Sequence, residues 1–564
     1  MARSRTRRRQ RVGVAAALAV ALLAADSSRG PVERAPASPP YVTFFLIDGL
    51  SQRVFEEELS AGHLPTMQRL IAEGVYVRNG IASFPSMTGY GFYPFITGHD
   101  AALSGVLGLR WFDADREAGG FRAYVGLTSG RMNEDFIPEP LTVYEHFGHQ
   151  HSHSINCYAN RGVETDTKFG LSFSLAKYQG QWWLSDGLRA VPGVGDELAP
   201  DWVGAERRVM ATAMDDLARR PKVQWITLTS PDGYQHVHGT TEGYRQILRD
   251  LDRLIGAYRE ESARLGQEDD RIYAVISDHG VEDVAQNLDM REVFRRCCAL
   301  SAFRGEATKF LSVNLDEPIE TYAPYDVITV INGNLLLYVY VRDHAVDDTQ
   351  QAWRRRQPAS ELRRFTRADG TEVDLIDAML AEPGIDHVLS RGEARGVVHV
   401  DGDRGSAMID EVAPNRFRYR VTGGADPLGY VADPAARRLL DGEGHSARAW
   451  LEATHASAFP DGVVRIARLF RTEDVGDMVL LAAPLYDFGR DYEAVVGNYR
   501  GGHGGLRADQ MRVPYILTGP GTARGMEVAT ARAEDVGRTL LELLRVRTLP
   551  TDLSGEIIEE ALAL

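Results

Sequence analysis

The feature that most constrains the fold is a set of short apolar runs that each end in an acidic residue. Residues 272–276 are Ile-Tyr-Ala-Val-Ile, and Asp278, His279 and Gly280 follow them closely. A run rich in β-branched and aromatic side chains is typical of a buried strand. An acid and a histidine where a strand ends are either ligands at a functional crevice or a polar turn. The pair alone does not decide between the two.

Two further runs end in the same way. Residues 41–47 (YVTFFLI) are followed by Asp48, and residues 222–230 (KVQWITLTS) are followed by PDGYQHVHG, which contains Asp232 and His236. These last two residues are four apart, and in a helical turn that spacing places both side chains on one face.

Helical periodicity separates these runs. In the segment 60–75 the apolar face holds Leu64, Met67, Leu70 and Ile71, and in the segment 242–260 it holds Tyr244, Ile247, Leu248, Leu251 and Ile255. Strands that alternate with helices predict an α/β fold with a mostly parallel central sheet and helices on both of its faces.

Two loops add candidate functional groups. His503 lies among four glycines, which allow the backbone to bend closely around a ligand. The alternative is a flexible turn with an incidental histidine. The segment 81–100 is dense in glycine, proline and hydroxyl residues, and reads either as a serine-rich loop or as a source of the nucleophile. Its candidate nucleophiles are Ser83, Ser86, Thr88 and Thr97.

Together the strand ends and the glycine-rich loop supply six candidate metal ligands: Asp48, Asp232, His236, Asp278, His279 and His503. Mixed aspartate and histidine ligands suit Zn²⁺ and related divalent metals. Six ligands with a hydroxyl between them divide naturally into two sites bridged by a substrate. Such paired ions clamp the attacking and leaving oxygens of an in-line displacement and lower the pKa of a coordinated hydroxyl.

The charge of the chain bears on its partners. The formal net charge is −16, and the first 25 residues carry six arginines and no acid, so the remainder is more acidic still. Nucleic acids are held by clustered Lys and Arg, and we therefore expect no nucleic-acid-binding surface. A small phosphorylated substrate remains compatible, because bound cations reverse the sign of the local field.

The N-terminus has the pattern of a signal peptide. A basic segment, Arg3–Arg11, precedes VGVAAALAVALLAA, an apolar run of fourteen residues. This run is shorter than the ~20 residues that a membrane span needs. We expect residues 1–25 to direct export, giving a periplasmic or secreted protein, with an uncleaved anchor as the alternative. The proline-rich residues 26–40 are predicted to be an extended linker.

The length of 564 residues exceeds one compact core. We assign residues 41–299 and 481–564 to the core domain and 300–480 to a large α+β insertion that caps the edge of the sheet. Within it, residues 327–343 are predicted to form a hairpin. Of the three cysteines, Cys297 and Cys298 are adjacent and are not expected to bridge each other, so at most one disulfide, to Cys157, is predicted.

The order of these motifs resembles the alkaline phosphatase superfamily, and within it the branch of type I phosphodiesterases and nucleotide pyrophosphatases. The motifs are Asp48, FPSMT nine residues before a Thr-Gly pair, PDGYQHVHG, SDHG and GGHGG. They lie within residues 41–113, 222–285 and 495–560, so the resemblance does not extend to the middle insertion.

The resemblance implies a division of the ligands between two divalent metal ions, with zinc expected. One ion would be bound by Asp232, His236 and His503, and the other by Asp48, Asp278 and His279. Thr88 would bridge both ions as the nucleophile, with Ser83 and Ser86 as open alternatives. The implied chemistry is attack of the Thr88 alkoxide on phosphorus, a phosphothreonine intermediate, and its hydrolysis.

One position departs from the pattern of that branch. Where the branch has an asparagine that holds a non-bridging phosphate oxygen, this chain has Leu109. The oxygen would have to be held by the metals, by backbone N–H groups, or by a side chain such as Arg110. Nearby aromatic residues either stack on a base or an aromatic leaving group or belong to the core. They are Tyr90, Phe92, Tyr93, Trp111 and Phe112.

The function expected from these features is a secreted, metal-dependent hydrolase that cleaves phosphodiesters or pyrophosphates. A phosphomonoesterase or phosphonate hydrolase of the same superfamily is the first alternative. A sulfatase is not expected, because the chain has no Cys-x-Pro-x-Arg segment. A non-catalytic surface binding protein that retains the fold is the alternative from another class. The sequence does not indicate the oligomeric state.

Overall fold

The computed structural model describes residues 39–114, 120–124, 126–169, 202–304, 318–489 and 499–563. The predicted signal peptide, residues 1–25, lies outside the described residues, as does all but the last part of the predicted linker, 26–40. None of the described helices has the length and hydropathy of a membrane span.

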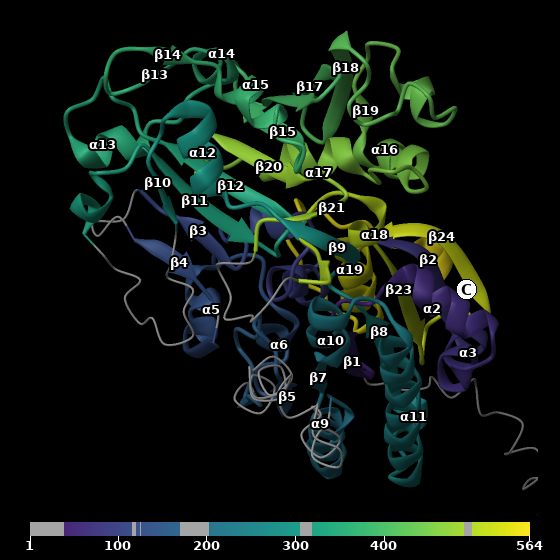
Figure 1. The fold of residues 1–564 in the computed structure, drawn as a ribbon. Coiled ribbons are helices and arrows are strands. Elements are labelled where there is room, and N and C mark those ends of the chain that lie inside the picture. The colour runs from purple at the N-terminus through teal and green to yellow at the C-terminus, as the bar shows by residue number, and fades with distance from the viewer. Residues whose placement is uncertain are drawn as a thin grey trace, which may run out of the picture. The chain divides into compact units, whose positions relative to one another are not determined.

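An eight-stranded sheet forms the core of the fold (Figure 1). From edge to edge its strands are β24 (Met526–Arg532), β2 (Val75–Ile81), β23 (Arg512–Thr518), β8 (Arg271–Ile276), β1 (Tyr41–Ile47), β7 (Val223–Leu228), β5 (Ser152–Ile155) and β6 (Thr165–Thr167). Neighbouring strands are parallel except that β23 is antiparallel to both β2 and β8. The predicted mostly parallel sheet is confirmed, with one reversed strand.

The middle of the sheet is β1, which lies between β7 and β8. Its side chains are buried on both faces, because Phe44 contributes to one hydrophobic cluster and Phe45 to another. A strand covered on both faces requires an almost continuous apolar sequence. The polar exception, Thr43, is hydrogen-bonded to the hydroxyl of Tyr258, 3.0 Å away.

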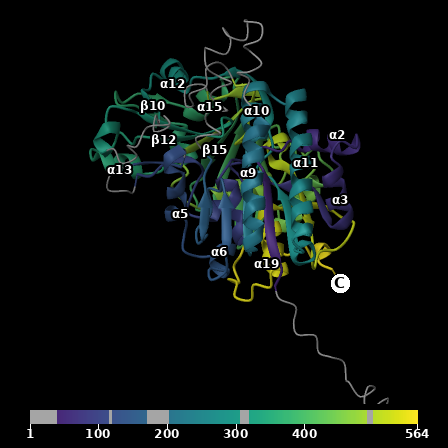
Figure 2. The same ribbon diagram turned by 90° about the horizontal axis from the view of Figure 1, so that it is seen from below.

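Helices cover both faces of the sheet, as predicted. On the face of Phe45 lie α2 (Gln52–Ser60), α3 (Pro65–Glu73), α9 (Trp202–Asp216) and α11 (Glu242–Arg264). Figure 2 shows α9, α11 and α10 (Ser230–His238) side by side. The predicted apolar stripe of α11 is buried at all five positions. In the α3 segment the first three predicted positions are buried and Ile71 is half-buried.

The face of Phe44 packs against helices from both ends of the chain. These are α4 (Tyr93–Thr97), α6 (Val143–His146) and α19 (Ala533–Leu543). The rings of Phe95 and Tyr515 meet edge to face, with their centroids 5.5 Å apart. All five aromatic residues considered as possible stacking partners are at most 5% exposed. They therefore form part of the core.

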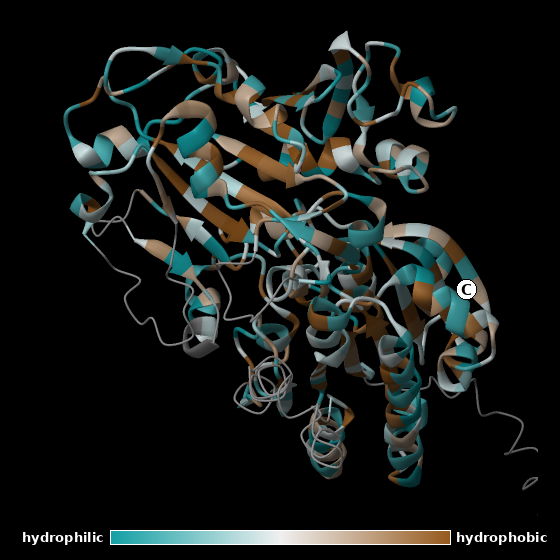
Figure 3. Ribbon diagram, in the orientation of Figure 1, coloured by the Kyte–Doolittle hydropathy of each residue, from teal (hydrophilic) through white to brown (hydrophobic). Residues whose placement is uncertain are grey.

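A second sheet has nine strands and comes mostly from the segment predicted to be an insertion, 300–480. In order across the sheet they are β10 (Ala302–Arg304), β11 (Val327–Asn332), β12 (Leu336–Val341), β20 (Met478–Ala482), β15 (Ile385–Arg391), β16 (Val397–Gly402), β17 (Gly405–Ala413), β18 (Arg416–Gly424) and β19 (His445–Ser446). The predicted hairpin is formed by β11 and β12. Figure 3 shows the apolar character of β11, β12 and β20. The boundaries of the insertion remain a prediction.

The described chain also contains further α-helices and strands. The helices are α5 (Met132–Asp135), α12 (Met290–Cys298), α13 (Thr349–Arg354), α14 (Ala359–Leu362), α15 (Leu375–Leu380), α16 (Ala447–Thr454), α17 (Gly462–Leu469) and α18 (Ala508–Met511). The strands are β3 (Arg110–Phe112), β4 (Phe121–Ala123), β9 (Glu282–Asn287), β13 (Phe365–Thr366), β14 (Glu372–Val373), β21 (Leu485–Asp487) and β22 (Gly501–Gly502).

Buried ion pairs join α17, which packs against the second sheet, to α19 and to Asp100. Arg465 and Arg468 of α17 each approach Asp100 Oδ2 at 2.8 Å, and both also pair with Glu534 of α19. These four side chains are at most 1% exposed. Buried charges are tolerated when they are paired and hydrogen-bonded, so the segment that contains α17 is fixed to the end of α4 and the start of α19.

The disulfide expectation was wrong. The structure pairs Cys297 with Cys298 at the end of α12, and Cys157 is a free, buried thiol. Cys157 lies beyond β5 in the central sheet, whereas α12 packs with the second sheet. The sequence does not show that the two segments belong to different hydrophobic clusters, and so it could not exclude a bridge between them.

Candidate active site

The polar residues that follow the central strands meet at one edge of the sheet. Because β1 lies between β7 and β8, the residues after all three strands are neighbours. Gly49, with φ +65°, permits this close approach, since a Cβ atom there would lie 3.0 Å from the Cβ of Asp232. The backbone N–H of Gly49 also donates to Asp278 Oδ1 over 3.4 Å.

Asp48, Asp278 and His279 form one compact group of buried side chains. The Nε2 atom of His279 lies 3.3 Å from Asp48 Oδ1 and 3.5 Å from Asp278 Oδ2. Among the described residues, Asp278 Oδ2 has no hydrogen-bond partner. A fully buried carboxylate oxygen without a hydrogen bond is costly unless something else binds it. This group is the same trio that the sequence analysis assigned to one metal.

Asp232, His236 and His503 lie beside that group. His236 Nε2 is 3.2 Å from Asp232 Oδ1, as expected for side chains four apart on α10, and His503 Nε2 is 3.5 Å from the same oxygen. Asp232, His279 and His503 also offer ligand atoms that all lie within 4.8 Å of one another. His279 therefore borders both groups, which the sequence pattern did not reveal.

Thr88 is the candidate hydroxyl that reaches this cluster. Its Oγ1 lies 3.3 Å from Asp48 Oδ1 and 3.2 Å from His279 Nε2, and the residue is half-buried. Ser83, Ser86 and Thr97 are each 0% exposed. Thr97 donates to the carbonyl of Tyr93 over 2.7 Å, within its own helix. Of the four hydroxyls, Thr88 is thus both accessible and in contact with the ligand candidates.

All three histidines are oriented by backbone carbonyls. The Nδ1–H groups of His236, His279 and His503 donate to the carbonyls of Gly501, Gly280 and Ser86 respectively, each over 2.9 Å. A hydrogen bond of this kind fixes the tautomer and the ring orientation of a metal-binding histidine. It leaves each Nε2 directed toward the carboxylates and available as a ligand.

Burial and mutual repulsion control ionisation of the carboxyl groups. Burial, reinforced by the neighbouring Asp48, raises the pKa of Asp278 well above its usual range, and burial with Asp232 raises the pKa of Asp48. For Asp232 burial acts in the same direction, but His236, His503 and His279 outweigh it and hold its pKa well below the usual value.

The imidazoles respond to the same charges. Burial opposes protonation of His279, but Asp278 and Asp48 outweigh burial and raise its pKa to about 10. Burial and the nearby His279 lower the pKa of His503 well below its ordinary value. The His279 and His503 rings are stacked 3.7 Å apart, so only one of them can readily carry charge.

The donor set fits divalent metal ions. Three carboxylates gather in a site where all six ligand candidates are at most 9% exposed, and protein cations do not balance them fully. The Nε2 atoms and the Asp278 oxygen that has no hydrogen bond within the described chain offer the nitrogen and oxygen donors that zinc accepts. A bound cation would relieve the repulsion between the carboxylates.

The glycine-rich loop is supported by a contact that the sequence analysis missed. The tip of the β11–β12 hairpin lies against His503: the His503 N–H donates to the Gly333 carbonyl over 3.0 Å, and the Leu335 N–H donates to the His503 carbonyl over 2.9 Å. Both segments were recognised as turns, but a turn signal does not say what a turn contacts.

Two further residues near the site were also missed. Glu206 of α9, which is 0% exposed, accepts the Ser230 N–H over 2.7 Å and so supports the first turn of α10. Tyr158 packs against Gly89, next to Thr88, and is only partly buried. Glu206 could have been suspected as an acid on an apolar helix face, whereas Tyr158 follows a short strand without any distinguishing pattern.

The segment around Leu109 uses its backbone donors within the protein. The Leu109 N–H lies 3.1 Å from Met87 Sδ, and the Arg110 N–H donates to Asn332 Oδ1 over 3.1 Å. The Asn332 amide in turn donates to the Arg110 carbonyl over 2.8 Å. These two N–H groups are therefore not directed toward a bound phosphate, and the side chain of Arg110 is 4% exposed.

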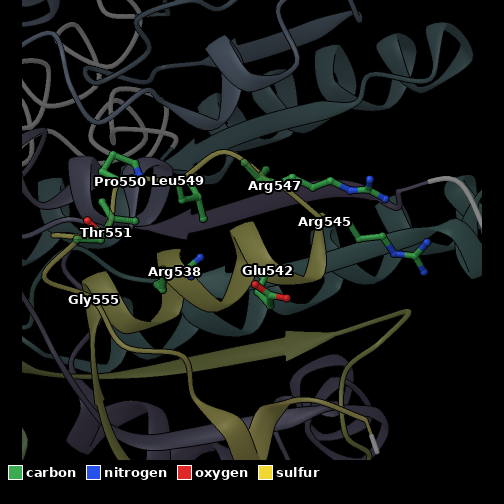
Figure 4. A pocket seen from close by; sticks show the side chains of 10 residues that line it. Arg538, Glu542, Arg545, Arg547, Leu549, Pro550, Thr551 and Gly555 are labelled. Atoms are coloured by element: carbon green, nitrogen blue, oxygen red, sulfur yellow. The ribbon is translucent and has the colours of Figure 1, made fainter.

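A separate cavity of about 690 Å³ lies beside α19 (Figure 4). Its lining residues are Arg538, Glu542, Arg545, Val546, Arg547, Leu549, Pro550, Thr551, Leu553 and Gly555. This lining includes neither Thr88 nor any of the six ligand candidates. The cavity is therefore not part of the candidate active site.

An α/β fold with aspartates, histidines and a threonine gathered at the carboxyl ends of its strands defines a hydrolase of the metal-dependent, phosphoester-cleaving class. The chain belongs to the type I phosphodiesterase / nucleotide pyrophosphatase family, whose model matches residues 42–435, more than half of the chain. This match confirms the resemblance inferred from the order of the motifs. Metal dependence is typical of this family.

Solved structures support the same architecture. Murine ectonucleotide pyrophosphatase / phosphodiesterase 5, in an inactive form in complex with AMP, has a TM-score of 0.51 and 11% identity, over 93% of this chain and 100% of that chain. A second structure of the murine protein has a TM-score of 0.50 and 12% identity, over 91% and 97% of the two chains. The likeness confirms the predicted alkaline phosphatase-like fold. No curated protein sequence matched the chain.

Proposed function

We propose that the protein hydrolyses phosphodiesters or pyrophosphates through Thr88 as the nucleophile, with two divalent metal ions. The observation that carries the proposal is the position of Thr88 Oγ1, 3.3 Å from Asp48 Oδ1 and 3.2 Å from His279 Nε2. A hydroxyl in contact with both a carboxylate and an imidazole has the contacts expected of an activated nucleophile.

The six ligand candidates would hold the ions as the motifs imply, with zinc expected. Asp232, His236 and His503 would bind one, and Asp48, Asp278 and His279 the other, with Thr88 adjoining the second. When bound, the ions would lower the pKa of the Thr88 hydroxyl and neutralise charge that develops on the phosphoryl oxygens.

The residues of the chain then perform a two-step transfer. Asp48 Oδ1 and His279 Nε2, which lie 3.3 Å from each other, both contact Oγ1 and so fix its position for attack. In the attack, Thr88 gives up its hydroxyl proton to solvent, Oγ1 bonds to phosphorus, and the bond to the leaving oxygen breaks. The leaving oxygen takes up a proton from solvent, and a phosphothreonine remains. Water then cleaves that phosphothreonine, releasing the phosphoryl product and restoring the Thr88 hydroxyl.

We infer a small phosphorylated molecule as the substrate, with a nucleotide as the first class to test. The family description and the AMP complex of the murine protein support this class. Leu109 supports the alternative of a phosphomonoesterase or phosphonate hydrolase, because it cannot hold a non-bridging oxygen as an asparagine does.

We further propose that the protein is exported through its N-terminal signal and acts in the periplasm or outside the cell. The basic and apolar segments of residues 1–25 support this proposal. Expression of the full chain, followed by fractionation and N-terminal sequencing, tests it. A mature N-terminus after the apolar run is expected, and an intact Met1 in the cytoplasmic fraction would contradict export.

The catalytic proposal is tested with the zinc-loaded protein on an aryl phosphate diester and the matching monoester. We expect turnover of the diester, its loss after chelation, and loss of at least 10²-fold in Thr88→Ala, by analogy with the removal of other nucleophiles. Thr88→Ser, which keeps a hydroxyl, serves as the matched control and should retain part of the activity. Unchanged turnover in Thr88→Ala would exclude this nucleophile, and preferential cleavage of the monoester would favour the alternative.

A further inference from the structure

Ser86 joins the nucleophile segment to the glycine-rich loop through four hydrogen bonds. Its N–H donates to the Gly504 carbonyl over 3.3 Å, and its carbonyl accepts from His503 Nδ1 over 2.9 Å. Its hydroxyl donates to the Gly505 carbonyl over 2.8 Å and accepts the Gly504 N–H over 3.1 Å. Every polar group of Ser86 is thus used by one short stretch of the loop.

These contacts link two parts of the site that are remote in sequence. Ser86 precedes Thr88 by two residues, and the loop carries His503, whose Nε2 points toward Asp232. The two segments form an isolated antiparallel bridge between Ser86 and Gly504. The direction of the His503 ring and the position of Thr88 therefore depend on the same residue.

The hydroxyl of Ser86 is not free to act as a nucleophile. It is 0% exposed, and its oxygen both donates and accepts within the loop. Breaking either bond would leave a buried backbone group of Gly504 or Gly505 without its partner, which is costly in a protein interior. We call these contacts of Ser86 with Gly504 and Gly505 the clamp. They explain the presence of Ser86, which the sequence alone had left as a possible nucleophile.

We propose that Ser86 is a positioning residue that sets His503 relative to Thr88 and so couples one metal site to the nucleophile. The inference rests on the proposed function, because it assigns His503 to a metal. Groups that orient a ligating histidine typically change metal affinity by 10–100-fold when they are altered. The clamp acts on His503 through the backbone carbonyl and through the loop that the hydroxyl holds.

The chain contains a matched control in Ser83. It lies three residues earlier in the same segment and is equally buried, at 0% exposure. Its Oγ has no hydrogen-bond partner in the part of the chain that the structure describes. Ser83→Ala and Ser86→Ala remove the same atom from similarly buried positions, but only the second removes contacts to the loop.

The test measures zinc affinity by competition with a chelator, and kcat and KM on the diester, in the full-length protein. We expect Ser86→Ala to weaken the binding of one of two ions by 10–100-fold, weaken that of the other less, and lower kcat more than it raises KM. Ser83→Ala should bind both ions like the wild type. In a His503→Ala background, Ser86→Ala should have little further effect on affinity, because the group that it positions is gone.

Three outcomes would overturn the inference. A folded Ser86→Ala protein that binds both ions with wild-type affinity shows that the clamp is dispensable. Equal weakening in Ser83→Ala shows a general loosening of the segment. A wild-type protein that binds no zinc removes the proposed function together with the inference, whereas the first two outcomes leave that function intact. If Ser86→Ala does not fold, Ser86→Cys, which keeps a weak hydrogen-bonding atom, takes its place under the same criteria.

Discussion

The imidazole rings of His279 and His503 are stacked, with centroids 3.7 Å apart and an angle of 11° between their planes. One ring follows the central strand β8, and the other comes from the glycine-rich loop near the C-terminus. Because His279 also approaches Asp48 at 3.3 Å, this pair of rings borders both proposed metal sites. We expect changes at either ring to be felt at both sites.

Replacing His236 by alanine is expected to remove most of the stabilisation that zinc confers. A ligand that binds only the folded state stabilises it by about 4 kcal/mol at a concentration 1,000 times its Kd, so a rise in Kd lowers the thermal midpoint measured with zinc. We expect His236→Ala to reduce the zinc-induced shift in Tm by more than half, as measured by thermal unfolding with and without chelator.

His238 provides the control for that experiment. It lies two residues further along the same helix, with its ring 4.6 Å from that of Tyr234 and outside the two groups of ligand candidates. His238→Ala should keep the zinc-induced shift. Equal losses in both variants would mean that the shift reports damage to α10 and not the loss of a ligand.

A methyl group at Gly333 is expected to disturb His503. Gly333 has φ +62°, and a Cβ atom there would lie 2.8 Å from His503 Nδ1, the atom that donates to Ser86. We expect Gly333→Ala to lower kcat on the diester by at least tenfold, because a misplacement of about 1 Å at a ligand can cost 10²-fold. Steady-state kinetics of the zinc-loaded protein provide the measurement.

Gly370 separates this contact from backbone strain. It has φ +81°, in the turn between β13 and β14, and a Cβ atom there would meet nothing within 4 Å. Both substitutions force alanine into a left-handed conformation at a cost of about 1–2 kcal/mol. Only Gly333→Ala should affect kcat, and a similar loss in Gly370→Ala would assign the effect to general destabilisation.

Much of the site could be predicted because its signals are local. The apolar runs before Asp48 and Asp278 have the composition of buried strands, and the position of β1 between β7 and β8 brings their ends together. The spacing of Asp232 and His236 is a property of one helix. Each of these predictions depends on residues within about one helical turn or strand of each other.

The remainder depends on contacts between distant segments. The hairpin tip at Gly333 and the loop at His503 both read as turns, but nothing in either turn indicates that they meet. The reversed direction of β23 likewise follows from how its connections cross the sheet, since its sequence is as apolar as that of a parallel strand. The role of Ser86 is visible only when Gly504 is placed beside it.

Arg465 is expected to be essential for stability. Its guanidinium is 1% exposed and lies 2.8 Å from Asp100 and 3.1 Å from Glu534, so its removal leaves carboxylates buried without their partner. Loss of one member of a buried ion pair typically costs roughly 3–5 kcal/mol. We expect Arg465→Met to lower the urea midpoint clearly at pH 8. Burial raises the pKa of Glu534 to about 7 despite Arg465, and the pKa rises further when Arg465 is removed. The deficit should therefore be largest at high pH and shrink as the pH falls toward 7, because the variant takes up the proton on Glu534 before the wild type does.

Arg53 is a suitable comparison for Arg465. It pairs with Glu57 on α2 at 3.2 Å, and both side chains are about half exposed. Exposed pairs of this type contribute roughly 0–1 kcal/mol, so Arg53→Met should leave the urea midpoint almost unchanged. A deficit in Arg465→Met no larger than in Arg53→Met would show that the ion pairs between α17, Asp100 and α19 do not hold these segments together.

Ionisation of Glu206 is expected to destabilise the folded protein as the pH rises. Its side chain is 0% exposed, one carboxylate oxygen has no partner among the described residues, and burial raises its pKa to about 7 from an ordinary 4.5. Because the folded-state pKa is the higher one, the stabilising contribution is complete below pH 4.5 and is lost as the pH rises through 7. Glu206→Gln cannot ionise at this position. Its free energy of unfolding should therefore rise relative to that of the wild type as the pH increases from 4.5 to 7, by up to about 3 kcal/mol. Denaturant unfolding of the chelated proteins from pH 4.5 to 8.5 measures this difference.

Two controls isolate the ionisation of Glu206. A changed hydrogen bond to Ser230 would shift the difference in the free energy of unfolding by the same amount at every pH, whereas ionisation makes that difference change with pH. Glu57→Gln is the control without a slope in this range, because the hydrogen bond from Arg245 lowers the pKa of Glu57 and its ionisation affects stability only below pH 4.5. A flat difference between Glu206→Gln and the wild type across this range would show that Glu206 is not held in its neutral form.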